Sequence, residues 1–302
     1  MSRRVTSGSV SVIMRSKNSA WVIGQALSGL FSQHRRDFEL LLVDSGSTDS
    51  TLDIARRFPC RVIQIAATEY FPGAVLNKAI QQARGDILVF QNSDVVPLAP
   101  NALELLLAPL ETGKADATFA RQLPRPEAHT WVRRDYAQAF PSQGVPPSWM
   151  VYSLPFAAMK RAAWERHPFY EDAWGSEDTE WGHWARQNDV VARYVPEALV
   201  MHSHNYTLRQ LYGRRFIEGE ADAFILRDTV SIPTFLRRVC RSWARDAGAH
   251  LVAGDLLGLM LSLPRRWVYH WAYLRGHSLG ERRKRTGSKD SSIGQRVVLD
   301  RG

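Results

Sequence analysis

Residues 38–51 read FELLLVDSGSTDST, an apolar run followed at once by acidic, hydroxyl and glycine residues. An apolar run of this length that ends in turn-forming residues is typical of a buried β-strand. We therefore predict a strand over Phe38–Val43, a turn over Asp44–Ser50 and a helix that continues to about Phe58.

The alternation of apolar strand and amphipathic helix continues on both sides of this stretch. We predict further strands over Ser9–Met14, Arg61–Ile65 and Asp86–Gln91, and helices over Ala20–Gln33 and Gly73–Arg84. Strands that alternate with helices form a mostly parallel sheet with helices on both faces. The predicted fold class is therefore α/β.

Polar clusters follow three of the predicted strands, at Arg15–Asn18, Asp44–Gly46 and Asn92–Asp94. Ligands of open α/β sheets bind at the carboxyl ends of the strands. The same residue types are also common in ordinary turns, so each cluster alone is better explained as a turn without a binding role. Together, on one rim of one sheet, the three clusters indicate a binding site.

The middle of the chain has a less regular pattern. Leu123–Pro147 is rich in proline and polar residues, which favours a long substrate loop. We predict a helix over Glu177–Gln187, capped by Ser176, with acids in its first turn. Two short strands are expected at Val190–Val195 and Ala198–His202.

After about Tyr206 the chain becomes helical, aromatic and rich in arginine. We predict helices over Leu208–Arg227 and Ile232–Tyr273, with a kink or break at Pro264. Val252–Leu263 is the most apolar segment, but it is too short to cross a bilayer. Because basic clusters flank it, it suits a buried helix or one that lies in a membrane interface.

Composition limits the class of protein. A chain of 302 residues with 45% hydrophobic residues can form one large α/β domain and an appended segment. A net charge of +9 suits nucleic acid, an anionic membrane or a phosphorylated substrate. The sequence has neither zinc-finger spacing nor an aromatic RNA-binding signature, so we expect no nucleic-acid partner.

Cysteine content and hydropathy indicate the compartment. Cys60 and Cys240 cannot build a disulfide framework, which fits a reducing compartment such as the cytoplasm. No apolar signal-peptide core follows Met1–Arg4, and no run of about 18 apolar residues is present. We therefore expect neither secretion nor a transmembrane helix.

Five segments resemble, in order and spacing, the successive motifs of the family 2 glycosyltransferases, which have the GT-A fold. They read VSVIMRSKN, LLLVDSGSTDST, ARGDILVFQNSDVVP, WGSEDTEWG and VMHSH. FPGAVLNKAI is similar to a loop of the bacterial rhamnosyltransferase-like branch, and the whole resemblance covers about Ser9–Tyr206. We accordingly expect a GT-A catalytic domain at residues 8–206, a helical extension at 207–280 and a disordered basic tail at 281–302.

The resemblance implies an inverting glycosyltransferase of cell-surface polysaccharide biosynthesis. Its donor would be a dTDP-, UDP- or GDP-sugar and its acceptor a glycan or a lipid-linked glycan. The basic, aromatic extension would fit an anionic membrane face, so we expect a cytoplasmic protein that is peripheral to the membrane. A sugar-nucleotidyltransferase is a rival interpretation, although MRSKNSAW lacks the glycines of its phosphate loop. A non-catalytic membrane-surface protein of the same fold is another.

A divalent cation, Mg²⁺ or Mn²⁺, would stabilise the charge that develops on a diphosphate leaving group. Such cations bind carboxylates, and Mn²⁺ also binds imidazole, so Asp94 is a candidate ligand at the end of the fourth strand. The resemblance implies a histidine as second ligand, which we assign to His202, with His204 as the alternative. Asn92, in place of the family's first acid, is expected to contact the ribose or phosphate.

The resemblance identifies Asp178 as the general base that deprotonates the acceptor hydroxyl. Glu177 would contact the acceptor or orient the loop, although two acids at a helix N-terminus also simply complement the helix dipole. Trp174 and Trp181 are candidate acceptor-binding residues, because aromatic faces pack against sugar rings. The two tryptophans suit a hydrophobic core equally well.

The remaining candidates would bind the nucleotide-sugar. Asp44 can accept a hydrogen bond from a pyrimidine N3–H, and Arg15 lies at the end of the first strand, near the base or the phosphates. Ser93 belongs to the same rim. Asn77 matches the asparagine of the family's loop, in which Leu76 replaces an arginine.

Overall fold

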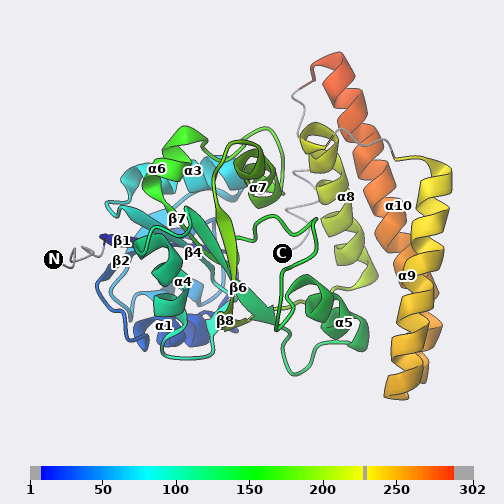
Figure 1. The fold of residues 1–302 in the computed structure, drawn as a ribbon, viewed down its shortest axis with the longest axis horizontal. Coiled ribbons are helices and arrows are strands. Elements are labelled where there is room, and N and C mark those ends of the chain that lie inside the picture. Colours follow the sequence, from blue (N-terminus) through cyan, green and yellow to red (C-terminus); the bar gives the residue numbers. More distant parts are fainter. Residues whose placement is uncertain (1–7, 227–229, 289–302) are drawn as a thin grey trace.

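The computed structural model describes residues 8–226 and 230–288. In this part of the chain, an eight-stranded mixed sheet carries helices on both faces, and three long C-terminal helices stand beside it (Figure 1). The strand order is β3-β2-β1-β4-β7-β6-β8-β5. The predicted α/β class is confirmed.

Four parallel strands form one half of the sheet: β1 (Val10–Ser16), β2 (Phe38–Asp44), β3 (Arg61–Gln64) and β4 (Ile87–Asn92). The central residues of β1, β2 and β4 are buried, as expected of strands covered on both faces, whereas those of the edge strand β3 are half-buried. The register pairs Ser16 with Asp44 and Arg15 with Asn92. The ends of β1, β2 and β4 therefore meet on one rim of the sheet, as predicted.

Two layers of helix cover the sheet. This half of the chain contributes α1 (Ile23–Phe31), α2 (Thr51–Ala55), the short 3₁₀ helix η1 (Ala67–Glu69), α3 (Pro72–Gln82) and α4 (Ala102–Glu111). Because successive strand residues point to opposite faces, Ile13 packs with α3, whereas Val12 packs with α1 and α4. Figure 1 shows α3 on one side of the sheet and α1 and α4 on the other.

The second half of the sheet is mixed. It contains β5 (Val96–Pro97), β6 (Ala117–Leu123), β7 (Phe156–Lys160) and β8 (Ala192–Met201), and β7 runs antiparallel to both of its neighbours. Two short strands are predicted at Val190–Val195 and Ala198–His202, but the structure has one continuous strand, β8, in their place. The register of β8 against β6 shifts between Ala120 and Arg121. Pro196 lies in the shifted segment and has no N–H to donate, which explains the interruption.

Helices of the middle segment differ from prediction at two points. The expected substrate loop contains α5 (Thr130–Ala139). α6 (Arg161–Arg166) follows β7, and α7 (Glu177–Gln187) has the predicted bounds. Ser176 precedes α7 with a left-handed φ of +62°, and its side chain makes no capping hydrogen bond. The predicted cap is therefore wrong, because a capping side chain normally bonds the helix from an extended backbone conformation, which Ser176 does not adopt.

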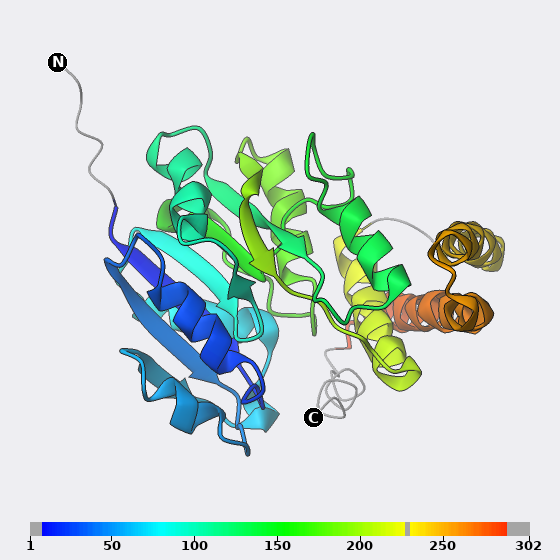
Figure 2. The same cartoon turned by 90° about the horizontal axis from the view of Figure 1, so that it is seen from below.

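Three helices form the C-terminal part: α8 (Leu208–Ile225), α9 (Ile232–Ala253) and α10 (Leu256–Thr286). Figure 2 shows α9 and α10 side by side, nearly end-on. Buried ion pairs join them, from Arg266 to Asp246 between α10 and α9, and from Arg283 to Glu220 between α10 and α8. None of the helices in the described ranges is long and apolar enough to span a membrane.

The break between the last two helices is not at the predicted place. It lies at Gly254, whose left-handed φ of +66° ends α9, whereas Pro264 remains inside α10 and only removes one backbone hydrogen bond. α10 continues to Thr286, so residues 281–286 of the predicted disordered tail are helical. Residues 289–302 of that tail lie outside the described residues.

Glycines allow α10 to approach α8 closely. A Cβ atom on Gly276 would overlap the carbonyl oxygen of Phe216 in α8, and a Cβ atom on Gly219 would overlap the carbonyl oxygen of Tyr273 in α10. Backbone atoms cannot move aside as a flexible side chain does. The two helices can therefore pack at this distance only with glycine at both positions.

Gly276→Ala should lower the free energy of unfolding by about 1–3 kcal/mol or more, because the added methyl group forces α10 away from α8. The matched control is Gly248→Ala in α9, where a Cβ atom would meet nothing within 4 Å. That control should be neutral or stabilising by up to about 1 kcal/mol, because alanine favours helix. Urea unfolding followed by circular dichroism measures both. Equal stability of the two variants would contradict the close contact.

Candidate active site

Two adjoining cavities, of about 410 and 570 Å³, lie at the carboxyl ends of β1 and β4. Both are lined by Arg15, Tyr70, Asn92, His204, Tyr206 and Arg214. Because they share these walls, we treat them as one cleft, with a first cavity toward α7 and α5 and a second toward the β1 loop. Arg214 belongs to α8, so the C-terminal helices form one wall of the cleft.

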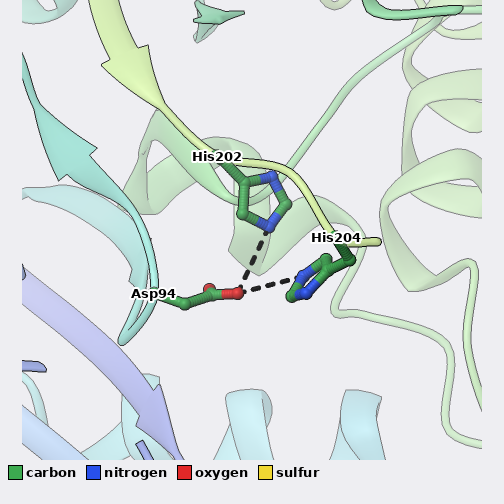
Figure 3. Close-up of side chains that lie close together, drawn as sticks. All are labelled: Asp94, His202 and His204. Carbon is green, nitrogen blue, oxygen red and sulfur yellow. Dashed lines mark ion pairs between the residues drawn. The ribbon is translucent and has the colours of Figure 1, made fainter. Parts of the chain in front are cut away.

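Asp94, His202 and His204 form a cluster at the boundary between the two cavities (Figure 3). Oδ2 of Asp94 lies 3.0 Å from Nε2 of His204 and 3.6 Å from Nε2 of His202. The turn after β4 supplies Asp94, and the segment after β8 supplies both histidines. The structure thus brings Asp94 together with the predicted ligand His202 and with its alternative His204.

Neighbouring groups orient this cluster. Nδ1 of His202 donates to Oε1 of Gln122 at 2.7 Å, which leaves Nε2 of His202 directed toward Asp94. Burial alone would raise the pKa of Asp94, but the charges and hydrogen bonds of the two histidines outweigh it and hold that pKa well below its usual range. Burial lowers the pKa of His204, partly offset by its hydrogen bond to Asp94.

The donor set is suitable for a divalent metal ion. One carboxylate oxygen and two imidazole nitrogens can lie within 4.8 Å of one another. Carboxylate and neutral imidazole are the ligands that Mn²⁺ accepts in proteins. The residues present therefore fit the cation that the sequence predicts.

Glu177 and Asp178 begin α7 and line the first cavity. Oε1 of Glu177 accepts a hydrogen bond from Nη1 of Arg15 at 2.6 Å, within a nearly buried ion pair. The carboxylate of Asp178 accepts from the backbone N–H of Leu154, at 3.2 Å, and of Thr179, at 2.8 Å. Asp178 is thereby held in a fixed position beside the cavity.

The surroundings of Asp178 make it a stronger base than an exposed carboxylate. Burial, followed by the negative charge of Glu177, raises the pKa of Asp178 to about 6. A carboxylate with this pKa is still mostly ionised at neutral pH, yet it holds a proton more readily than usual. Perturbed carboxyl groups in clefts are typical of catalytic sites.

The structure places two of the predicted nucleotide contacts, Asp44 and Asn77, outside the linings of both cavities. Asp44 is fully buried, and its carboxylate accepts hydrogen bonds from the backbone of Gly46 and Ser47 within its own turn, outside both cavity linings. The Asn77 amide donates to Phe169 and Glu171 and accepts from Trp164 and from Phe169. Both side chains therefore use their polar atoms to hold the fold.

The other predicted contacts remain at the cleft. Asn92 lines both cavities, and Ser93, whose hydroxyl lies 2.7 Å from that of Ser19, lines the second. Trp174 lines the first cavity. Trp181 is corrected, because it is fully buried in the core against Tyr152 and does not reach the cleft.

The sequence analysis missed several aromatic residues of the cleft. Trp131, Tyr136 and Tyr269 line the first cavity, and they come from α5 and α10. Among the described residues, the buried indole N–H groups of Trp131 and Trp174 have no hydrogen-bond acceptor. Trp21, 60% exposed, lines the second cavity beneath the guanidinium of Arg125. The sequence offered one signal for Trp21, namely a tryptophan that follows closely after the end of the first strand.

Comparison with protein families matches residues 11–167 to the model described as Glycosyl transferase family 2. The chain is 31% identical over 201 residues to the O-antigen chain rhamnosyltransferase WbaN of Salmonella anatum, across 62% of this chain and 63% of that relative. It is 24% identical over 223 residues to the O-antigen chain rhamnosyltransferase RfbN of Salmonella typhimurium, across 70% and 71% of the two chains. The chain thus spans less than two thirds of the first relative's length.

Solved structures of similar fold include a Pyrobaculum calidifontis mannosyltransferase in complex with GDP-Man and Mn²⁺, with a TM-score of 0.62, 20% identity and coverage of 91% and 87% of the two chains. Glucosyl-3-phosphoglycerate synthase of Mycobacterium tuberculosis, with Mn²⁺, UDP-glucose and phosphoglyceric acid, has a TM-score of 0.54 at 22% identity and covers 72% and 79%. At these identities the likeness establishes the fold alone. It confirms the predicted GT-A architecture with a helical C-terminus.

Proposed function

Because the chain belongs to glycosyl transferase family 2, we propose that it is an inverting, metal-dependent glycosyltransferase of polysaccharide biosynthesis. The observation that carries this proposal is the position of Asp178. It lines the same cavity as His202 and His204 of the candidate metal cluster. A general base and a cationic site on one cleft are what sugar transfer from a nucleotide-sugar requires.

In the proposed reaction, Asp178 accepts the proton of an acceptor hydroxyl while that oxygen attacks the anomeric carbon of the donor. The bond from the anomeric carbon to the diphosphate breaks on the opposite face, and the diphosphate leaves with the bonding electrons. A single in-line displacement of this kind inverts the anomeric carbon. Glu177, paired with Arg15, orients the start of α7 so that Asp178 faces the acceptor.

Positive charge at the leaving group comes from two sources in this proposal. A divalent cation held by Asp94, His202 and His204 would stabilise the charge that develops on the diphosphate. Arg214 lines both cavities, so its guanidinium faces the same region from α8. These groups favour catalysis over the non-catalytic alternative.

The two cavities suit the two substrates. The second is lined by polar groups of the β1 loop and by Trp21, so we assign it to the nucleotide of a dTDP-, UDP- or GDP-sugar. The first contains Asp178 and the free indole donors of Trp131 and Trp174, so we assign it to a glycan or lipid-linked acceptor. The names of the two Salmonella relatives favour an O-antigen-like acceptor. With such an acceptor, the protein would work at the cytoplasmic membrane surface.

Asp178→Asn should lower kcat about 10²–10⁴-fold and leave donor binding intact, because the amide cannot take the hydroxyl proton. Nucleoside diphosphate release from dTDP-, UDP- and GDP-sugars with Mn²⁺ or Mg²⁺, with a lipid-linked glycan as acceptor, measures turnover. Donor-dependent thermal stabilisation measures binding. Asp172→Asn, on the exposed loop before α7, makes the same charge change and should be silent. Wild-type turnover by Asp178→Asn would refute the assigned base.

At pH values below about 6, kcat/KM should decrease, because Asp178 takes up a proton and can no longer act as a base. This decrease is the acid limb of the pH profile. The charged or titratable groups that face it are Glu177, Arg15, Tyr152 and Arg214. Glu177→Gln removes the like charge, which lowers the Asp178 pKa and should move the acid limb to lower pH.

The matched control for the pH profile is Glu180→Gln in the same helix, where Glu180 instead pairs with His167. This change should leave the limb in place. An acid limb that is unmoved in Glu177→Gln, or moved to higher pH, would show that another group controls it.

Asp94→Asn and His204→Ala should each weaken Mn²⁺ binding about tenfold or more, because each removes a ligand atom of the cluster. Gln122→Ala should weaken it less severely, through misorientation of His202. Isothermal titration with Mn²⁺ after chelation, in the presence of nucleoside diphosphate, gives the affinities. The control is His34→Ala, which removes an exposed histidine that does not belong to the cluster. Equal Mn²⁺ affinity in all four variants would exclude this cluster as the site.

A further inference from the structure

The turn between α9 and α10 exposes a continuous group of apolar side chains. Within residues 251–263, seven large apolar residues are exposed, and Val252 and Met260 are 92% and 76% accessible. We call this set the apolar tip: Leu251, Val252, Leu256, Leu257, Met260, Leu261 and Leu263. It lies at the end of the α9–α10 pair that extends past α5 in Figure 1. Single exposed apolar residues are ordinary, but a contiguous group marks a binding surface.

Several polar groups of this turn are bonded within the protein. The N–H groups of Gly254 and Asp255 donate to the carbonyl oxygens of Leu251 and His250. The carboxylate of Asp255 accepts from the N–H of Gly258 and is also bonded to His250 and Thr130. Bonds of this kind lower the cost of bringing these polar groups close to lipid.

Arginines and tryptophans lie a short distance behind the apolar tip. At about 1.5 Å of rise per residue, the exposed Arg245 and Arg241 of α9 stand about 10 and 16 Å from Val252. The half-exposed Trp243 and Trp267 lie at comparable depth on the two helices. Cations and tryptophans at this level match the phosphate and interfacial layers of a bilayer.

We propose that the apolar tip inserts into one leaflet of an anionic lipid bilayer, with Arg241 and Arg245 at the level of the lipid phosphates. The net charge of +9 favours an anionic surface over a neutral one. The segment 251–263 is shorter than the roughly 18–20 apolar residues that a spanning helix needs, so the insertion is shallow. Docking of this kind holds the chain at the surface without crossing it.

The apolar tip is linked directly to the acceptor side of the cleft. Thr130, at the start of α5, donates to Asp255 in the turn at 3.1 Å. The next residue, Trp131, lines the first cavity and carries the guanidinium of Arg265 above its ring, at 4.7 Å. Docking would therefore place the acceptor cavity beside the bilayer. This consequence, unlike the docking itself, rests on the proposed function.

Co-sedimentation of the full chain with vesicles tests the proposal, using phosphatidylcholine alone or phosphatidylcholine with phosphatidylglycerol. Leu256→Gln/Leu257→Gln/Met260→Gln should bind the anionic vesicles at least about tenfold more weakly than the wild type, because it removes apolar surface from the tip. The control Leu98→Gln/Val145→Gln/Val191→Gln changes three exposed apolar residues of the α/β domain and should bind as the wild type does.

A second pair of variants tests the charge. Arg241→Gln/Arg245→Gln should lose most of the preference for phosphatidylglycerol, several-fold in affinity. Arg57→Gln/Arg193→Gln removes two exposed arginines of the α/β domain and should keep the preference. Since both variants lower the net charge equally, a difference between them locates the effect on α9.

Three results would overturn the proposal: wild-type binding without preference for phosphatidylglycerol, unchanged binding by the triple tip variant, or no vesicle binding at all. If light scattering then showed a dimer that the tip variant abolishes, the tip would be a contact between two copies of the chain. Nucleotide-sugar binding, measured by thermal stabilisation without vesicles, reports on the proposed function separately. A chain that bound vesicles but no nucleotide-sugar would refute the function and leave the docking in place.

Discussion

The ion pair between Arg15 and Glu177 joins the two halves of the α/β domain across the cleft. Arg15 is the last but one residue of β1 in the parallel half, and Glu177 begins α7, which packs on the mixed half. The buried Glu177 carboxylate needs a positive partner, which Arg15 supplies. Because of this pair, the two acids Glu177 and Asp178 can lie next to each other at the start of α7. The pair thus ties the start of α7 to the end of β1, while backbone N–H groups of Leu154 and Thr179 hold the Asp178 carboxylate itself.

The C-terminal helices form part of the wall of the candidate active site. Arg214 and Tyr269 come from α8 and α10, and both line the first cavity. The close approach of these two helices at Gly219 and Gly276 fixes the positions of those side chains. We therefore regard the boundary expected near residue 207 as a change in architecture that does not separate two functions.

The strands and their polar ends could be predicted because alternation and turn chemistry are local. The prediction of Asp94, His202 and Asp178 as site residues also depended on the order of the family motifs. No local pattern shows that residues so far apart in the sequence meet. The sequence did not show which candidate side chains are buried inside the fold. Asn77 and Trp181 have the residue types of a sugar site, yet tertiary packing uses both inside the fold. Likewise, the helix break lies at Gly254 because only glycine readily adopts its backbone angles, while Pro264 is tolerated in α10.

Because α10 continues through Pro264, it holds the apolar tip at a fixed distance from the first cavity. Tyr269, on the wall of the first cavity, lies thirteen residues after Leu256, or about 20 Å along the helix axis. With Arg241 and Arg245 at the level of the lipid phosphates, about 10–16 Å from the tip, the cavity would stand only about 4–10 Å beyond the phosphates. Such a spacer would select acceptors by height, and so it would measure how many units of a growing glycan already separate the reactive sugar from its lipid.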